Sequence, residues 1–476
     1  MRDPSPLPAP QSAFYRAVWR LHFYAGILVA PFAIFLAVTG SIYLWKPQYE
    51  ESEYRHVFNV PVREASVSAA AQLDAARAAA PPGFHAQTFQ PSFTPGRTAQ
   101  VVFKPAGAGQ FEQGLSLFVD PHTGAVVGSI DDRTRFMRIV HDLHGTLLAG
   151  RIGQYIVELA ASWALVLFLT GLYLAWPRPG FAVWGFLLPR LRAKGRLFWR
   201  DIHAVPAVWL SVATIFMLST GLLWTQAAGG WYRTVSAMLG QATPKETSAG
   251  AHRSELTGWS PPLQAGLAEK IDALVSTPSI HEGHAGHGVS VAPASTGPEE
   301  NALPLDRVIA LAAGHRVPTP CVIALPVGPR GVYSVLSDRN QALTRTYLHL
   351  DQYSGRVLAD VRFDDFGALA QFSLWGIIAH EGQLFGLLNQ ILGTLAAGGV
   401  VLLALSGLVM WWKRRPAGSL APPSASGALP RPVILGTAVL AFLLPLLAVS
   451  LAFLLVADRA FLFLHRRRTR RAPEAA

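Results

Sequence analysis

Five long stretches without a single Asp, Glu, Lys or Arg constrain the fold of this chain more than any other feature. They cover residues 21–45, 159–177, 202–232, 382–412 and 432–457. A helix needs about 20 apolar residues to cross the hydrocarbon of a bilayer, and all five stretches meet or nearly meet that length. With 51% hydrophobic and 14% charged residues, the composition is also that of an integral membrane protein. The sequence therefore predicts a helical bundle in a lipid bilayer.

The basic residues predict how the bundle is oriented. Segment 178–200 carries six Lys or Arg residues and no acid. Cytoplasmic loops are enriched in Lys and Arg, so we expect this segment and the N-terminus to lie in the cytoplasm. The long segments 46–152 and 226–381 are then periplasmic. The formal net charge of +11 follows from such loops, and no nucleic-acid partner is expected.

The two long segments resemble each other and indicate an internal duplication. In each, a helical run (66–80 and 304–314) precedes strand-like runs, which are predicted at 99–104, 115–119, 322–327, 332–336 and 346–350. Asp120 and Gly124 match Asp351 and Gly355 between such runs. Asp and Gly at this spacing favour a hairpin turn over a metal-binding pair of carboxylates. The sequence therefore predicts two copies of one unit, each made of a membrane helix, a periplasmic segment and a second membrane helix.

Four histidines occupy matched positions in this duplication. His22 and His203 stand at the start of the first and third spans, and each is followed after 17 and 18 residues by Thr-Gly. His144 and His380 precede the second and fourth spans, and each is followed after 26 and 27 residues by Thr-Gly or Ser-Gly. Ionisable residues are costly in membranes and usually have a partner. Imidazoles are good haem ligands on both faces of the iron.

We therefore predict two bis-histidine haem b groups per chain. His22 and His203 lie at the cytoplasmic depth and would hold one, and His144 and His380 lie at the periplasmic depth and would hold the other. Gly40 and Gly221 lie five helical turns beyond His22 and His203, on the same faces, where a missing side chain lets a macrocycle or a neighbouring helix come close. Because His144 is far from the membrane along a straight helix, a bend is expected near Gly145, Gly150 and Gly153.

The remaining histidines have weaker signals. His141 precedes His144 by one turn, but its counterpart in the second half is Ile377, so a surface histidine is favoured over a ligand. His281, His284 and His287 lie in the Gly-, Ser- and Pro-rich stretch 277–298 and can form an accessory metal site or a plain solvated loop. Cys321 is the single cysteine, which excludes covalent attachment of haem through Cys-x-x-Cys-His.

Several of these motifs resemble the PepSY-associated transmembrane family of bacterial inner-membrane proteins. They are Trp-Arg-Leu-His22, His144-Gly-Thr-Leu-Leu-Ala-Gly150, Trp-Arg-Asp-Ile-His203, His380-Glu-Gly-Gln-Leu-Phe-Gly386 and Gly407-Leu-Val-Met-Trp-Trp-Lys-Arg-Arg415. The stretch Leu-Phe-Val-Asp120-Pro-His-Thr-Gly resembles a PepSY unit. One group of this family consists of di-haem reductases of ferric siderophores. The resemblance implies an enzyme of iron acquisition that passes electrons across the inner membrane to a periplasmic ferric siderophore or another Fe(III) chelate.

The predicted fold class is a membrane all-α bundle of four core helices from the duplication, with a fifth C-terminal helix and two α+β PepSY-like periplasmic domains. The expected spans are 14–45, 202–225 and 432–457, and the second and fourth spans are expected together with their histidine-bearing segments at 141–177 and 373–413. The other expected segments are the domains 46–140 and 226–372, the loop 178–201, the linker 414–431 and the tail 458–476.

Three functions follow from these features. The first is a di-haem oxidoreductase that takes electrons from a quinol or a cytoplasmic donor. The second is a non-enzymatic membrane anchor whose PepSY domains bind a periplasmic partner, which needs no histidines in register. The third is a metal transporter, which usually needs ionisable groups near the membrane midplane, where these spans have almost none.

Overall fold

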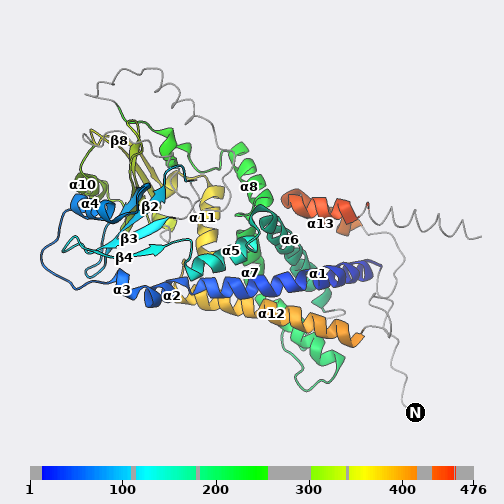
Figure 1. Cartoon of the computed structure of the whole chain (residues 1–476). Helices are drawn as coiled ribbons and strands as arrows, with labels where there is room; N and C mark the ends of the chain where they lie inside the picture. The colour runs from blue at the N-terminus through cyan, green and yellow to red at the C-terminus, as the bar shows by residue number, and fades with distance from the viewer. Residues whose placement is uncertain are drawn as a thin grey trace, which may run out of the picture. The chain divides into compact units, whose positions relative to one another are not determined.

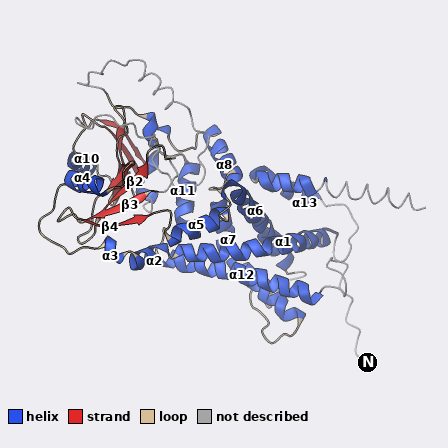
Figure 2. Cartoon of the chain, in the orientation of Figure 1, coloured by secondary structure: helices blue, strands red, loops and turns tan. Residues whose placement is uncertain are grey.

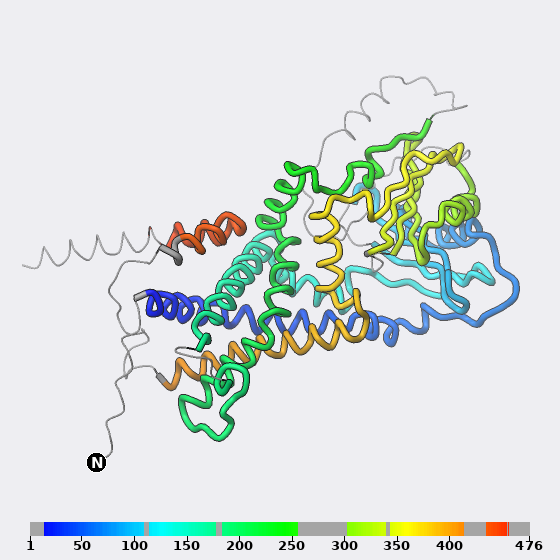
Figure 3. Tube along the Cα trace, turned by 180° about the vertical axis from the view of Figure 1, so that it is seen from behind, coloured from blue at the N-terminus to red at the C-terminus, as the bar shows by residue number. Residues whose placement is uncertain are grey.

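The computed structural model describes residues 13–108, 114–177, 183–255, 302–338, 342–414, 431–454 and 456. It divides into two compact units, one made of residues 1–41, 142–234 and 391–476 and the other of residues 42–141 and 235–390. Figure 1 and Figure 3 show the chain from opposite sides, and Figure 2 marks its helices and strands. Among the described residues, the first unit is helical and the second contains the strands.

Four helices of the described chain are long and apolar enough to cross a membrane. They are α1 (Ala13–Leu44), α6 (Gly150–Ala175), α7 (Arg196–Leu222) and α12 (Leu387–Arg414). Four of the five predicted spans correspond to helices of this length, and α6 and α12 begin at Gly150 and Leu387, well inside the predicted segments 141–177 and 373–413. Their polar residues are few, and a buried apolar cluster around Trp163 and Val166 of α6 and Leu222 of α7 holds the unit together.

The fifth apolar segment differs from the prediction. It is described as two short helices, α13 (Arg431–Leu443) and a helix at Pro445–Leu454, and neither has the length of a span. Pro445 has no backbone N–H and breaks the helix at this point. Leu444 and Leu447 are nonetheless buried in the apolar cluster of the bundle, and Trp163 Nε1 donates to Ser450 Oγ at 3.2 Å. The segment therefore packs on α6 without forming one continuous helix among the described residues.

The helices that carry His144 and His380 are separate from the spans that follow them. These are α5 (Phe136–Thr146) and α11 (Ala368–His380). Between α5 and α6 the chain turns through Leu147, Leu148 and Gly150, all with positive φ. Between α11 and α12 it turns through Gly382 and Gly386, also with positive φ. The predicted bend near Gly150 is confirmed, and it recurs at the matching place in the second half.

The second unit is built on one antiparallel sheet of eight strands rather than on two separate small sheets. The strand order is β4-β3-β2-β1-β5-β6-β7-β8. The first half contributes β1 (Phe84–Gln90), β2 (Ala99–Pro105), β3 (Leu115–Val119) and β4 (Val126–Asp131), and the second half contributes β5 (Cys321–Ala324), β6 (Val332–Ser337), β7 (Thr346–Asp351) and β8 (Val357–Arg362). The halves join where Phe89 of β1 pairs with Ile323 of β5. The two predicted α+β domains therefore share one sheet.

One face of this sheet is covered by α4 (Ala69–Ala79) and α10 (Leu305–Gly314), which lie together in Figure 1. Side chains from both helices and from six strands form a single apolar core that includes Leu73, Val101, Val308 and Leu348. Asp306 of α10 accepts hydrogen bonds from the backbone N–H groups of α4 at Ala69 (2.7 Å) and Ala70 (3.1 Å). The two halves thus share a core as well as a sheet.

The short elements complete this unit. They are α2 (Lys46–Glu53), α3 (Arg55–Phe58), α8 (Ala227–Met238), η1 (Lys245–Thr247), η2 (Ala249–Ala251), η4 (Ala342–Thr344) and η5 (Phe363–Asp365), of which α8 begins in the helical unit.

The matched Asp-Gly turns are hairpin turns, as expected. Asp351 Oδ1 accepts the N–H of Tyr353 (2.9 Å) and of Ser354 (2.8 Å), and Gly355 has a φ of 71°. Burial alone would raise the pKa of Asp351, but these hydrogen bonds outweigh it, and the pKa lies below its ordinary value.

Candidate functional site

The imidazole ring of His22, in α1, packs against α6. Its Nδ1 lies 2.9 Å from Thr170 Oγ1. The next residue, Gly171, leaves room for the ring, since a Cβ there would lie 3.2 Å from His22 Cε1. The Thr-Gly pair near the end of α6 therefore does not contact His144, the histidine that precedes α6 in the sequence. It receives the imidazole of a different helix.

His203 of α7 is seated on α12 in the same way. Its Nδ1 lies 3.0 Å from the carbonyl oxygen of Leu403 and 3.1 Å from Ser406 Oγ. A Cβ on Gly407 would lie 3.4 Å from His203 Cε1. Since a carbonyl oxygen can only accept, Nδ1 of His203 carries the proton and donates it. The lone pair of the neutral ring is then on Nε2, which is free to bind a metal.

His144 of α5 is seated on α1. Its Nδ1 lies 3.1 Å from Thr39 Oγ1, and a Cβ on Gly40 would lie 2.9 Å from its Cε1. The Thr39 hydroxyl has one proton, and it donates to the carbonyl of Phe35 at 2.9 Å. Nδ1 of His144 must then be the donor to the hydroxyl oxygen. Thr170 repeats this arrangement, because its hydroxyl donates to the carbonyl of Val166 at 2.7 Å.

All three histidines therefore have Nδ1 held by an oxygen of another helix, and in His22 and His203 the lone pair is left on Nε2. A metal-binding histidine usually donates its second N–H to a protein acceptor, which fixes the tautomer and the ring orientation. Of the two alternatives predicted for Gly40, a macrocycle or a neighbouring helix, the structure has the neighbouring helix, because the His144 ring of α5 occupies the space that the missing side chain leaves. Sequence spacing could not reveal this, since each seat lies on another helix.

His22 and His203 lie close together, as predicted from their matched positions. Their ring centroids are 6.3 Å apart and their planes are at 89°. An imidazole nitrogen lies about 2 Å from a bound metal and about 1 Å from its own ring centre, so two rings on one metal have centres about 6 Å apart. Perpendicular planes are compatible with this, because each ring plane need only contain its own bond to the metal. The geometry of this pair fits a bis-imidazole metal centre.

The remaining predicted residues are His380, Gly221 and His141. His380 ends α11 in the sheet-bearing unit, whereas His144 and its seat lie in the helical unit, so their pairing stays a prediction. Gly221 follows Thr220 in α7, and Thr220 has the same local arrangement as Thr39, with its hydroxyl donating to the carbonyl of Phe216 at 2.8 Å. The ring of His141 lies 5.5 Å from that of Tyr43, in an aromatic contact.

The accessory metal site is not tested by the structure. His281, His284 and His287 fall outside the described residues. Within the described residues, no group of three or more His, Cys, Asp or Glu side chains is arranged to hold a metal ion. We call each hydroxyl residue and the glycine that follows it, where they receive a histidine ring from another helix, a histidine seat; the seats are Thr170-Gly171, Ser406-Gly407 and Thr39-Gly40. In the part of the chain that the structure describes, these seats and their histidines are the candidate site in the membrane.

The sheet-bearing unit has a small cavity of its own that the sequence did not indicate. Its volume is about 290 Å³, near the lower limit of ligand pockets. Phe58, Phe93 and Phe118 line it together with amide and hydroxyl side chains and Arg97. The pocket thus combines aromatic surface with a guanidinium group.

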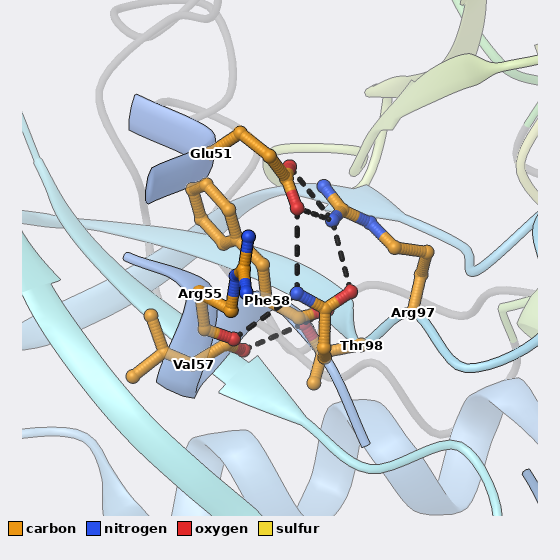
Figure 4. Close-up of polar contacts among 7 residues, drawn as sticks. Glu51, Arg55, Val57, Phe58, Arg97 and Thr98 are labelled. Atoms are coloured by element: carbon orange, nitrogen blue, oxygen red, sulfur yellow. Dashed lines mark hydrogen bonds and ion pairs between the residues drawn. The ribbon is translucent and has the colours of Figure 1, made fainter. Parts of the chain in front are cut away.

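Figure 4 shows how Arg97 is held at this cavity. Its Nη1 donates to both carboxylate oxygens of Glu51 at 2.8 Å and to Asn59 Oδ1 at 3.1 Å, and its guanidinium lies 5.2 Å from the ring centre of Phe58. Burial would raise the pKa of Glu51, but the hydrogen bonds from Arg97 and Asn59 and the charge of Arg97 lower it below its ordinary value.

Comparison with known proteins gives one clear result. No curated protein matches the chain. The profile of the PepSY-associated TM region matches residues 19–414, which include all four helices long enough to span a membrane and both halves of the duplication. The chain is a membrane protein and belongs to the PepSY-associated transmembrane family.

Proposed function

We propose that this protein is a di-haem b oxidoreductase of the bacterial inner membrane that reduces a periplasmic Fe(III) chelate of the ferric-siderophore kind. The observation that carries the proposal is the pair of seated histidines, His22 and His203, whose ring centres lie 6.3 Å apart with Nε2 of His203 left free. A helix that only anchors the protein has no need of two imidazoles at this separation.

The residues have distinct roles in this proposal. His22 and His203 would hold one haem through Nε2, and His144 and His380 would hold the second. Thr170, Ser406 and Thr39 fix the rings through Nδ1 and keep each one in the ligating tautomer. Haem at these sites would supply one-electron transfer at a potential tuned by bis-histidine ligation and burial.

The direction of electron flow follows from the distribution of basic residues. The Arg-rich segment 178–200 is assigned to the cytoplasm, so the His22 and His203 end of the bundle receives electrons from a quinol or a cytoplasmic donor. The sheet-bearing unit is assigned to the periplasm, where one electron converts Fe(III) in the chelate to Fe(II). The weaker hold of siderophores on Fe(II) then releases the metal.

A second function is favoured by the cavity beside Arg97. A membrane-anchored protein that binds a periplasmic partner or ligand through this cavity would need no haem. A metal transporter is less well supported, since 21–45, 159–177 and 202–232 contain no Asp, Glu, Lys or Arg.

The proposal is tested by anaerobic reduction followed by addition of a ferric siderophore. The dithionite-reduced protein should show a b-type spectrum, reoxidise on addition of the chelate and release Fe(II) that a ferrous chelator traps. His22→Ala should lose part of the spectrum and most of the reoxidation, while His56→Ala, on an exposed histidine of the sheet-bearing unit, should behave as wild type. A colourless wild-type protein from haem-replete cells would leave the binding-protein function in its place.

A further inference from the structure

Glu158 of α6 is a fully buried carboxylate within a membrane span. It is 0% exposed, and its two oxygens accept hydrogen bonds from the backbone N–H groups of Ala227 (2.9 Å) and Ala228 (2.8 Å). These residues begin α8, and Figures 1 and 3 show α8 starting beside α6. The Glu158 carboxyl oxygens thus accept from two N–H groups in the first turn of α8, where a helix leaves its N–H groups without partners of its own. An ionisable group at this place in a membrane protein is costly and marks a functional site by default.

The residues one turn before and one turn after Glu158 are polar, and each has a buried side-chain oxygen without a hydrogen-bond partner. Ser162 is 0% exposed and its Oγ has no hydrogen-bond partner, and Gln154 has a buried Oε1 without a partner. Residues four apart on a helix are neighbours on its surface. Buried polar atoms left unpaired among the described residues call for an explanation, and ordered water is the usual one.

These three side chains form a chemically complete proton site, in contrast to a simple helix cap. While Glu158 is a carboxylate, its oxygens need only donors, and α8 provides them. When Glu158 takes up a proton, one oxygen becomes a donor and needs an acceptor. Gln154 Oε1 and Ser162 Oγ are unpaired acceptors within one turn of it. A residue that only capped α8 would not require them.

The surroundings contain few other charges. Glu158 makes no ion pair with a described residue. Across 159–177 and 202–232 there is no Asp, Glu, Lys or Arg. On α8 the nearby ionisable groups are Tyr232 and Arg233, whose Nη1 lies 3.4 Å from where a Cβ on Gly229 would be. On α6 the other charged residue is Arg151, almost two turns away toward the N-terminus.

We propose that Glu158 takes up one proton from water when an electron enters the haem groups and releases it when the electron leaves, with Gln154 and Ser162 accepting from the protonated carboxyl. This inference rests on the proposed function. An added electron places uncompensated negative charge in a low-dielectric interior, and proton uptake by a carboxylate buried in the same helical unit as His22, His203 and His144 offsets that cost. In each reduction the haem groups accept one electron from an external reductant, and the Glu158 carboxylate forms one O–H bond with a proton taken from water.

The test is infrared difference spectroscopy on the full-length protein, oxidised against dithionite-reduced, in H2O and in D2O. Reduction of the wild type should produce a protonated carboxyl band that shifts in D2O. Glu158→Gln, which keeps an oxygen to accept from α8, should lack the band while retaining haem. Asp201→Asn is the matched control, because Asp201 is also buried but is paired with Arg190 and Arg200, and the band should persist.

A redox titration gives a second, independent readout. The midpoint potential of the wild type should fall as pH rises, and Glu158→Gln should flatten that dependence. Gln154→Leu should shift the band in frequency without removing it, which separates loss of an acceptor from misfolding. If haem is present and reducible but the band and the pH dependence survive in Glu158→Gln, the inference is wrong and the proposed function stands. If the wild type binds no haem, both fail.

Discussion

At the residue scale, the histidine seats combine a hydroxyl and a glycine from one helix with an imidazole from another. The sequence predicts the ligands from matched spacing, because His22, His203, His144 and His380 recur in a duplication. It could not predict that Thr39-Gly40 receives His144, or that Thr170-Gly171 receives His22, because spacing along one helix carries no information about the neighbour across the bundle.

Two glycines on α1 give a direct test of the seats. A Cβ on Gly40 would lie 2.9 Å from His144 Cε1, whereas a Cβ on Gly26 would lie 3.9 Å from Leu167 Cδ2, an ordinary contact. Gly40→Ala should therefore displace the imidazole of His144 and lower the haem bound per chain by about half, since one of two ligand sets is disturbed. Gly26→Ala should leave it unchanged. Equal haem content in the two purified variants would show that the space at Gly40 is not needed to position His144 for haem binding.

At the element scale, the turn between α5 and α6 explains how His144 reaches the bundle. A straight helix would carry this histidine beyond the membrane, and the sequence predicts a bend at glycines near it. The structure places the turn at Leu147 and Leu148, with φ of 51° and 56°, before Gly150. The leucines could not be foreseen as turn residues, since β-carbons disfavour positive φ.

The strain at this turn can be measured. Leu148 is 61% exposed, so Leu148→Gly loses little packing and should stabilise the fold by about 1 kcal/mol through relief of its positive φ. Gly150→Ala imposes a β-carbon on a φ of 54° and should destabilise it by a similar amount. Thermal melting in detergent would compare the two. A lower melting temperature for Leu148→Gly would contradict the assigned turn.

Strand β7 contains a buried histidine that the sequence did not single out. His349 is 0% exposed, with Nδ1 2.7 Å from Ser334 Oγ and Nε2 3.2 Å from the carbonyl oxygen of Thr247, and the ring of His252 lies 4.7 Å away. Burial, and then the nearby His252, lower the pKa of His349 from 6.5 to about 4.

This pKa predicts an acid-sensitive fold. The unfolded chain binds a proton at His349 below about pH 6.5, and the folded chain resists it down to about pH 4, so the contribution is complete above the upper value and falls away as pH decreases through this window. The loss is at most about 3 kcal/mol. His349→Gln should show a smaller drop in melting temperature than wild type between pH 7.5 and pH 5. Parallel melting curves with the same drop would show that another group controls acid sensitivity.

At the scale of the whole molecule, the duplication accounts for both units. Uncharged runs predict the four spans because the bilayer demands them, and strand-like runs predict β2, β3, β5, β6 and β7. The missed strands β1, β4 and β8 are half-exposed or contain glycine, so their alternation is weak. The joining of both halves in one sheet depends on pairing of β1 with β5 across a long sequence separation, which local patterns do not encode. Without it, each half would have an unprotected edge strand.

The central claim is that histidines from opposite repeats hold two haems, and the haem content of the purified full-length protein tests it most directly. Wild type should bind about two haem b groups per chain, while His22→Ala and His144→Ala should each retain about one and remain folded. Wild-type protein without haem, or full haem content in both variants, would contradict the account.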